Sequence, residues 1–168
     1  MGDAPNPAAV TVRPAVPKDA DGITRVYIES AEHHARLDPE RYWIPPVAEI
    51  SSRYREGRQH PPDAGAQAIT LVAELGGEIV GFVDVQLDHS PDPMFRESIY
   101  CYVAEIAVSS RHQSQGIGAQ LMQVAEEWGR RQGVSFAALN YLANNTRAAS
   151  FYRRQGYGVA AIKAIKRL

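Results

Sequence analysis

The feature that most constrains the fold is an apolar run that ends in a glycine-containing stretch and leads into a helix-like segment. The run ESIYCYVAEIAV (residues 97–108) is almost continuously apolar, as is typical of a strand covered on both faces. After RHQSQGIGAQL (111–121), apolar residues recur at helical spacing at Leu121, Val124, Ala125 and Trp128. The sequence therefore predicts a strand, a glycine loop and a helix in succession, which indicates an α/β fold.

The rest of the chain alternates between strand-like and helix-like segments. Gly76-Gly77 separates two strand-like runs and predicts a hairpin turn. Proline-containing loops, DPERYWIPP and HPPDAGAQ, flank the second helix. The element order is β-α-α-β-β-β-α-β-α-β, which predicts a sheet that mixes antiparallel hairpins with parallel crossovers. The other expected strands cover residues 11–16, 68–75, 78–87, 134–142 and 157–168, and the other expected helices cover 20–37, 47–59 and 146–155.

Capping residues mark several of the expected helix ends. Asp19 is the predicted N-cap of the first long helix, and Asn145 or Asn144 that of the last one. Gly133 and Gly156 stand where a helix commonly ends in the left-handed conformation.

Composition narrows the class of protein. A length of 168 residues suits one domain, which we expect over residues 11–168, after a flexible N-terminus over 1–10. A net charge of −1 gives no case for nucleic-acid binding, and no apolar run is long enough to span a membrane. The start lacks the regions of a signal peptide, and one cysteine, Cys101, allows no intrachain disulfide. We therefore expect a cytoplasmic protein.

The histidines do not predict a metal site. They are adjacent on one helix or scattered along the chain, with none of the spacings that metal ligands show. We expect no bound metal, and histidines that lie at the surface or at the rim of a pocket: His33, His34, His60, His89 and His112.

The glycine stretch is suited to binding an anion. The first amides of a helix lack partners within the helix and lie at the positive end of its dipole, and glycines let a phosphate come close. A dinucleotide fingerprint would need glycine at Leu121, and a P-loop would need Lys after Gly118, where Ala119 stands. Both motifs fail, and a plain turn between strand and helix stays open.

Two spaced motifs resemble the GNAT superfamily of N-acetyltransferases. Gln113-Ser114-Gln115-Gly116-Ile117-Gly118 matches the superfamily's Gln/Arg-x-x-Gly-x-Gly/Ala motif in full. Downstream, NTRAASFYRRQGY is similar to its Asn-x-x-Ala-x-x-aromatic-Tyr motif, which Gly-aromatic follows. The resemblance covers nearly the whole chain from Thr11. It implies a mixed, mostly antiparallel sheet with helices on both faces, splayed around an acetyl-CoA cleft.

The resemblance also implies which residues hold the acyl donor, acetyl-CoA. The pyrophosphate is expected on the amides of residues 113–119, ending at Ala119, and the pantetheine arm along the strand that ends in Ala107-Val108. The Asn145 side chain is expected to bond the pantetheine amide. Arg111 or Arg154 is expected to reach a cofactor phosphate, unless each is a solvated surface arginine.

Acetyl transfer to an amine needs a proton acceptor and a proton donor. Glu105, a lone acid in an apolar strand, is the candidate base, with Asp84 and Asp88 as rivals; a buried, structurally paired Glu105 is the alternative. The resemblance places Tyr152 near the cofactor sulfur as the candidate acid, although its spacing with Ala148 and Phe151 also suits a core tyrosine.

The acceptor is the least constrained part of the hypothesis. The resemblance places the acceptor pocket at the first two helices and their loop, whose aromatic residues suit an apolar or cationic acceptor. We expect a small-molecule amine. A protein N-terminus or lysine is an alternative, as is a module that binds acetyl-CoA without catalysis. The resemblance is also compatible with a homodimer paired through late strands.

Overall fold

The computed structural model describes residues 9–56, 68–90 and 92–167. Their elements follow the order β-α-α-β-β-β-α-β-α, with short 3-10 turns at 17–19 and 110–112. The strands are β1 (Thr11–Pro14), β2 (Ala68–Leu75), β3 (Glu78–His89), β4 (Ile99–Val108) and β5 (Ala137–Leu139). The helices are α1 (Ala20–Leu37), α2 (Val47–Arg55), α3 (Ile117–Arg131) and α4 (Thr146–Arg154).

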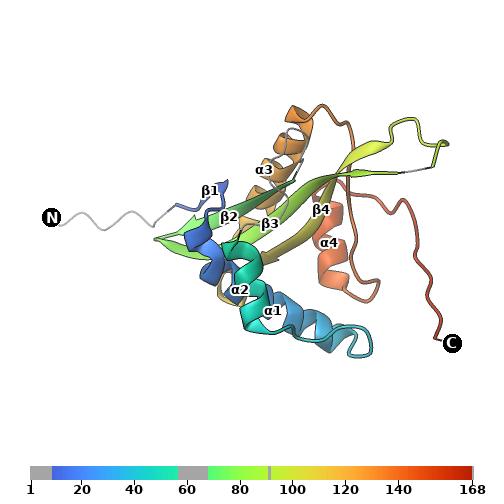
Figure 1. Ribbon diagram of the computed structural model, residues 1–168. Helices are drawn as coiled ribbons and strands as arrows, with labels where there is room; N and C mark the ends of the chain where they lie inside the picture. The colour runs from blue at the N-terminus through green and yellow to red at the C-terminus, as the bar shows by residue number, and fades with distance from the viewer. Residues whose placement is uncertain (1–8, 57–67, 91, 168) are drawn as a thin grey trace.

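The five strands form one sheet in the order β1-β2-β3-β4-β5 (Figure 1). The first four strands pair in antiparallel fashion, and β5 pairs with β4 in parallel. The turn between β2 and β3 has positive φ at both Gly76 (59°) and Gly77 (84°), which a two-residue hairpin of this type requires. The mixed, mostly antiparallel sheet predicted from the sequence is therefore confirmed.

Helices cover both faces of the sheet, and each face has its own apolar core. On one face α1 and α2 pack on the sheet through a cluster that includes Ile23, Ile50 and Phe82. On the other face α3 packs through Leu121 and Met122, which are buried with residues of β2, β3 and β4. The sheet is thus a rigid middle layer that fixes where each strand and helix end lies.

Several expected elements are found at the expected residues. The helix over 20–37 and the strand over 68–75 have the predicted bounds. Asn145 caps α4 by accepting a hydrogen bond from the Ala148 amide at 3.0 Å. Asp19 occupies the N-cap position of α1, but its carboxylate does not cap that helix. It instead binds Arg13 and the Val16 amide, so the cap prediction is correct in position and wrong in contact.

The predicted last strand, 157–168, is wrong for its described residues. Residues 157–167 form no helix or strand, and nearly all of them are exposed. The preceding strand is also shorter than predicted, because only Ala137–Leu139 of 134–142 pair with β4. An apolar pattern can predict a strand, but a strand forms only where a neighbouring edge accepts its hydrogen bonds. Residues 1–8 of the expected N-terminus, residues 57–59 of the expected second helix and the loop that contains His60 lie outside the described residues.

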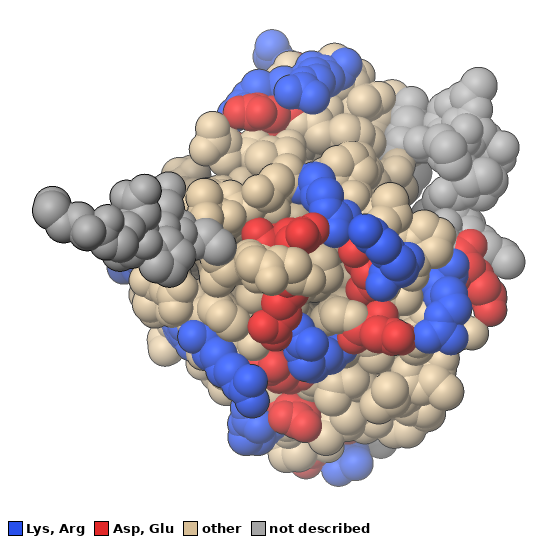
Figure 2. All heavy atoms as spheres, turned by 90° about the vertical axis from the view of Figure 1, so that its left-hand side faces the viewer, with Lys and Arg blue, Asp and Glu red and all other residues tan. Residues whose placement is uncertain are grey.

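Charges of both signs alternate on the face that carries β1 and the β2–β3 hairpin (Figure 2). On this face no patch of a single sign dominates, in keeping with the net charge of −1. Of the helices that the structure describes, none is both long enough and apolar enough to cross a bilayer.

Candidate functional site

The sheet opens on one side of β4, at the middle of that strand. β5 pairs only with Cys101–Val103, so β4 continues beyond it from Ala104 to Val108. At the same point the register between β3 and β4 shifts: Asp84 lies opposite Glu105, whereas Val85 lies opposite Val103. The extra residue, Ala104, is a β-bulge, a feature that re-aims side chains and is common next to active sites. The edge of β4 beyond Val103 therefore has backbone groups that β5 does not bond, and it borders a gap between β4 and β5. Glu105 is the residue directly after the bulge.

The glycine loop lies at the end of this free edge. Gly116, with φ of 81°, is the N-cap residue of α3, and Ser114 also has a positive φ, 64°. The first helical hydrogen bond runs from the Gln120 amide to the Gly116 carbonyl. The backbone amides of residues 117–119 therefore have no partner within the helix. These amides and the dipole of a 15-residue helix favour an anion at this place.

Gln113 joins the loop to the two elements beside it. Its side-chain nitrogen, Nε2, donates to the Val108 carbonyl at 3.1 Å. Its side-chain oxygen accepts from Arg147, in the first turn of α4. The sequence analysis did not single out Arg147, although it lies within the second motif, two residues after Asn145. Arg111 and Arg154, the arginines it did propose, are exposed. The structure thus adds Arg147 as a cation next to the loop.

Two further contacts fix the start of the loop. Glu29 of α1 accepts from the Ser110 amide at 2.6 Å and from the Ser109 hydroxyl at 3.2 Å, which ties the turn after β4 to α1. In the same turn, Nδ1 of His112 is buried and has no hydrogen-bond partner among the described residues. Glu29 thus fixes the start of the loop, and Nδ1 of His112 is a hydrogen-bonding group there that the described residues do not use.

Glu105 lies at the gap and faces α1. The Ser30 hydroxyl donates to its carboxylate at 3.2 Å, and the side chain is half-buried. Its charge contributes, after burial, to the raised pKa values of both Tyr27 on α1 and Tyr152 on α4. A single carboxylate therefore lies between helices from opposite sides of the gap.

The two rival acids lie elsewhere. Asp84 is fully buried and accepts hydrogen bonds from the hydroxyls of Tyr54, at 2.8 Å, and Thr70, at 2.6 Å. Asp88 is four residues further along β3, roughly 13 Å at the usual strand rise, and accepts from the Tyr100 hydroxyl and the His89 amide. Glu105 is thus the acid of the three that combines partial exposure with a place at the gap.

Tyr152 is buried on α4 at the other side of the gap. Its ring packs against those of Tyr141, Phe151 and Tyr157, with centroid distances of 5.2 to 6.1 Å. Burial and then the charge of Glu105 raise the pKa of Tyr152 to about 12. The phenol therefore keeps its proton at neutral pH, as a proton donor must.

Contacts between α1 and the start of α4 span the gap. The Asn144 side chain donates to the Leu37 carbonyl at 2.9 Å. Burial lowers the pKa of His33, as do the charges of His34, Arg36 and Arg147, while a hydrogen bond to Asn145 opposes them. These contacts fix the position of α1 relative to α4. Helix α1 carries Ser30, which bonds Glu105, and α4 carries Tyr152.

A cavity of about 370 Å³ opens beside Glu105. It is formed by α1, α2 and the loop between them, where the sequence analysis expected an acceptor pocket. Tyr27, Tyr42 and Trp43 contribute to the wall of the cavity, and Trp43 is 71% exposed. Apart from Glu105, the acidic and basic side chains at this cavity are His34, Arg41, Glu49 and Arg53.

Within the described residues, no group of three or more His, Cys, Asp or Glu side chains could hold a metal ion. Cys101 is a free, buried thiol whose pKa burial raises to about 11, with a smaller contribution from Glu126. It is accordingly a weak nucleophile at neutral pH.

Comparisons with known proteins identify the family to which the chain belongs. The model of the Acetyltransferase (GNAT) family matches residues 32–157. An uncharacterized N-acetyltransferase of Archaeoglobus fulgidus is 30% identical over 152 residues, which are 86% of this chain and 90% of that protein. The chain therefore belongs to the GNAT family and is an acetyltransferase. N-acetyltransferase 8F1 of Mus musculus is 33% identical over 86 residues, 51% of this chain and 37% of its own.

Solved structures with low sequence identity share the fold. A tetramutant of the BH1408 protein from Bacillus halodurans has a TM-score of 0.82 at 19% identity, covering 94% of this chain and 99% of its own. The aminoglycoside N-acetyltransferase AAC(6')-Iy in complex with CoA has a TM-score of 0.74 at 16% identity, covering 98% of both chains. These similarities confirm the predicted fold class.

Proposed function

We propose that this protein transfers the acetyl group of acetyl-CoA to the primary amine of a small molecule, by direct attack of the amine on the thioester. The observation that carries the proposal is the place where β5 leaves β4. There a free strand edge, the glycine loop and the side chains of Glu105 and Tyr152 lie together. The complex of AAC(6')-Iy with CoA supports the donor, because that protein shares the fold.

The chain's own groups fit acetyl-CoA. The amides of 117–119 and the unused His112 nitrogen supply hydrogen-bonding capacity at the loop, and Arg147 supplies a positive charge. Apart from the Val108 carbonyl, which accepts from Gln113, the free edge of β4 from Ala104 to Val108 offers backbone groups to the pantetheine amides, as another strand would. Among the further residues proposed to hold the cofactor, Asn145 is tied to its helix cap, and Arg154 lies in the last turn of α4.

In the proposed reaction Glu105 is the base and Tyr152 the acid. An alkyl amine has a pKa of about 10.4, so it must lose a proton before its nitrogen can attack. Glu105 accepts that proton, directly or through water, and the neutral nitrogen then forms the carbon–nitrogen bond. As the carbon–sulfur bond breaks, Tyr152 donates its proton to the sulfur. The nitrogen, which still carries one proton more than an amide, loses it through water to the Tyr152 phenolate, and Glu105 releases its own proton to the solvent. The products are the N-acetylated amine and CoA with a free thiol.

The alternatives differ in the acceptor. A protein N-terminus or lysine would have to place its amine at Glu105 through the same cavity, whose volume of about 370 Å³ is that of a small-molecule site. A module that binds acetyl-CoA without catalysis would bind the donor but acetylate no amine. Turnover and donor binding are therefore measured separately.

The first test is calorimetric titration with acetyl-CoA. Gln115 is exposed in the loop just before α3, and Gln115→Glu adds a negative charge there with almost no change in size. We expect it to weaken acetyl-CoA binding about tenfold, because like charges a few ångströms apart repel by about 1 kcal/mol or more near a surface. The helix itself is not weakened, since an acid near a helix N-terminus is favourable.

Gln123→Glu is the matched control for this titration. It makes the same change of charge on an exposed residue of α3, about one and a half turns beyond its N-terminus. We expect it to leave the affinity for acetyl-CoA within about twofold of the parent value. Absence of binding by the folded parent protein, or equal losses in both variants, would refute the proposed role of the loop.

We also propose that the protein forms a homodimer through its C-terminal segment, residues 158–167. This segment leaves the body of the fold beyond α4 (Figure 1) and exposes Val159, Ile162 and Ile165 by 57 to 88%. Contiguous exposed apolar residues commonly mark an interface. In the described sheet, β5 is one of the two edge strands, and Phe136 just before it is 61% exposed.

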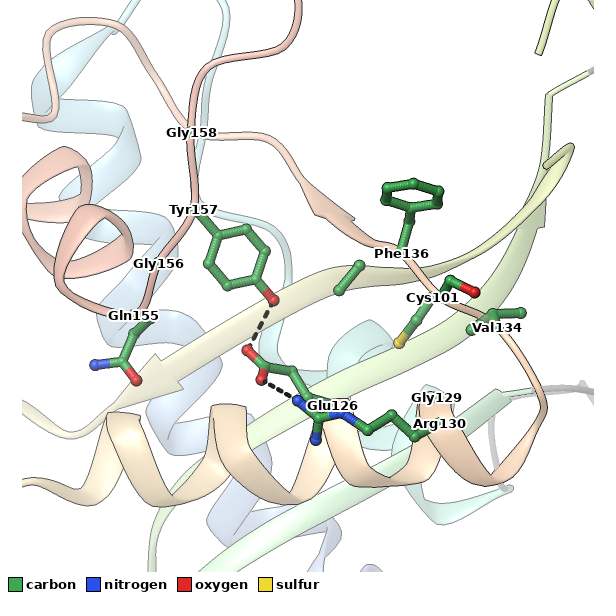
Figure 3. A pocket seen from close by; sticks show the side chains of 12 residues that line it. Cys101, Glu126, Gly129, Arg130, Val134, Phe136, Gln155, Gly156, Tyr157 and Gly158 are labelled. Atoms are coloured by element: carbon green, nitrogen blue, oxygen red, sulfur yellow. Dashed lines mark hydrogen bonds and ion pairs between the residues drawn. The ribbon is translucent and has the colours of Figure 1, made fainter. Parts of the chain in front are cut away.

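A cavity of about 300 Å³ lies where this segment begins (Figure 3). Tyr157 and Gly158 form one side of it, and Cys101, Gly129 and Phe136 lie around the start of β5. The Tyr157 hydroxyl donates to Glu126 at 3.1 Å, which fixes the root of the segment. The open edge of β5 and this hollow can receive the C-terminal segment of a second copy as an added strand.

Light scattering tests the dimer. We expect the parent protein to have twice the mass of one chain and Ile162→Asp to have the mass of a monomer. The substitution would bury an unpaired charge in the proposed dimer interface, which costs free energy of association. Met94→Asp is the control, since Met94 is 83% exposed on the β3–β4 connection. A monomeric parent, or a dimer that persists in Ile162→Asp, would contradict this assembly.

A further inference from the structure

We infer that the acceptor is a small amine that also carries an anionic group, such as a carboxylate, which Arg53 binds. This inference rests on the proposed function and names the substrate class of the same site. It concerns the cavity beside Glu105, between α1, α2 and their loop. The argument depends on the charges that line this cavity and on which of them already have partners.

The lining carries charges of both signs in equal number. Glu49 and Glu105 contribute the acids, and Arg41 and Arg53 the permanent cations. A polycationic acceptor, such as an aminoglycoside, would bring several positive charges close to two guanidinium groups. A balanced lining with separated charges instead complements a ligand that carries one charge of each sign.

The two arginines differ in their contacts. Arg41 pairs with Asp38, which lies outside the cavity lining. No ion pair joins Arg53 to a carboxylate among the residues that the structure describes. Glu49 stands one turn before Arg53 on α2, at the spacing where helical ion pairs form, and yet the two are not paired. Arg53 is therefore the cation at this cavity that is available to a ligand.

Arg53 and Glu105 share the wall of this cavity with Tyr27. Burial and then the Glu105 charge raise the pKa of Tyr27, and the Arg53 charge opposes them. The Tyr27 ring is held in place by Phe82 and Tyr54, with centroid distances of 6.3 and 6.4 Å. The cavity thus presents a cation on α2 and the proposed base on β4, and the separation of these two charges sets the direction of a bound ligand.

A ligand with an amine and a carboxylate fits that direction. The amine nitrogen goes to Glu105, where the acetyl group is transferred, and the carboxylate goes to the Arg53 guanidinium, which suits bidentate pairing. The exposed faces of Tyr42 (39%) and Trp43 (71%) can then cover an apolar side chain of the same ligand. An apolar α-amino acid has all three parts.

The test compares L-phenylalanine with L-phenylalaninamide as acceptors. The two share the amine and the ring, and only the first carries the negative charge. We expect Arg53→Gln to raise KM for phenylalanine about 10- to 100-fold, the range that loss of a charged hydrogen-bonded pair gives. The same variant should leave KM for the amide within about twofold. Comparing variants on each acceptor removes the difference in intrinsic reactivity between the two amines.

Arg55→Gln is the matched control. Arg55 lies on the same helix, pairs with Asp21 and does not line the cavity. We expect it to leave both KM values unchanged. The inference is overturned if Arg53→Gln affects both acceptors equally, or if the parent protein acetylates an aminoglycoside but neither phenylalanine nor its amide. In either case acetyl transfer itself is observed, so the proposed function stands. Acetyl-CoA binding without turnover of any amine overturns both proposals.

Discussion

Glu105→Gln is expected to lower kcat by roughly 10²- to 10³-fold while the affinity for acetyl-CoA stays within about twofold of the parent value. The amide has nearly the shape of the carboxylate and can still accept the hydrogen bond from Ser30. It cannot accept a proton from the amine. Single-turnover kinetics with saturating acetyl-CoA and acceptor measure the chemical step apart from binding.

The pH profile gives a second measurement of the same role. The parent kcat/KM should fall at low pH as both the acceptor amine and the base become protonated, and Glu105→Gln should keep only the part that the amine causes. Glu49→Gln is the control, because Glu49 lines the same cavity but is exposed on α2. If Glu49→Gln slows turnover as much as Glu105→Gln, or if Glu105→Gln leaves the shape of the low-pH profile unchanged, the base is another group.

The sequence was sufficient for the parts of the fold whose signals are local. The apolar stripe of α1 and the positive-φ glycines of the β2–β3 turn act over a few residues, and both elements are found as predicted. The cap of α4 by Asn145 is another local interaction. Such features need no knowledge of distant contacts, which is why pattern and propensity identify them.

The parts that the sequence did not predict depend on tertiary contacts. The segment 157–167 has the composition of a strand but pairs with no strand of the described sheet. Asp19 leaves its capping role because Arg13, held in β1 six residues earlier, is a stronger partner. Both outcomes depend on which groups the fold brings close, and a one-dimensional pattern does not contain that information.

The candidate site divides in the same way. Tyr152 and the loop from Gln113 to Ala119 could be proposed from motifs, because each motif is contiguous or nearly so, and Glu105 could be proposed because it is a lone acid in an apolar strand. Arg147 beside Gln113, and Ser30 beside Glu105, come from helices far along the chain. The charges of the cavity were equally hidden, because Arg53 on α2 and Glu105 on β4 are far apart in the sequence and meet only at the cavity. The class of chemistry, acetyl transfer, could thus be predicted, whereas the proposed selectivity rests on the structure.

Tyr152→Phe is expected to lower kcat by roughly 10²-fold and to leave acetyl-CoA affinity and stability nearly unchanged. The substitution removes only the hydroxyl and keeps the ring that packs against Tyr141, Phe151 and Tyr157. Tyr141→Phe is the matched control, since its ring lies 5.5 Å from that of Tyr152 and its side chain is partly exposed. Equal rates in the two variants would remove Tyr152 from the mechanism.

The raised pKa of Tyr152 makes this role testable by titration. Burial and then the Glu105 charge raise it from 10.0 to about 12, so the donor stays protonated well above neutral pH. Activity that depends on this proton should persist as pH rises through 10 and decline only as it approaches about 12. Glu105→Gln removes the negative neighbour, so the Tyr152 pKa should fall, and tyrosinate absorbance should appear at lower pH than in the parent. An unchanged absorbance titration in that variant would mean that the two groups do not interact, and the proposed acid–base pair would then fail even if each residue mattered separately.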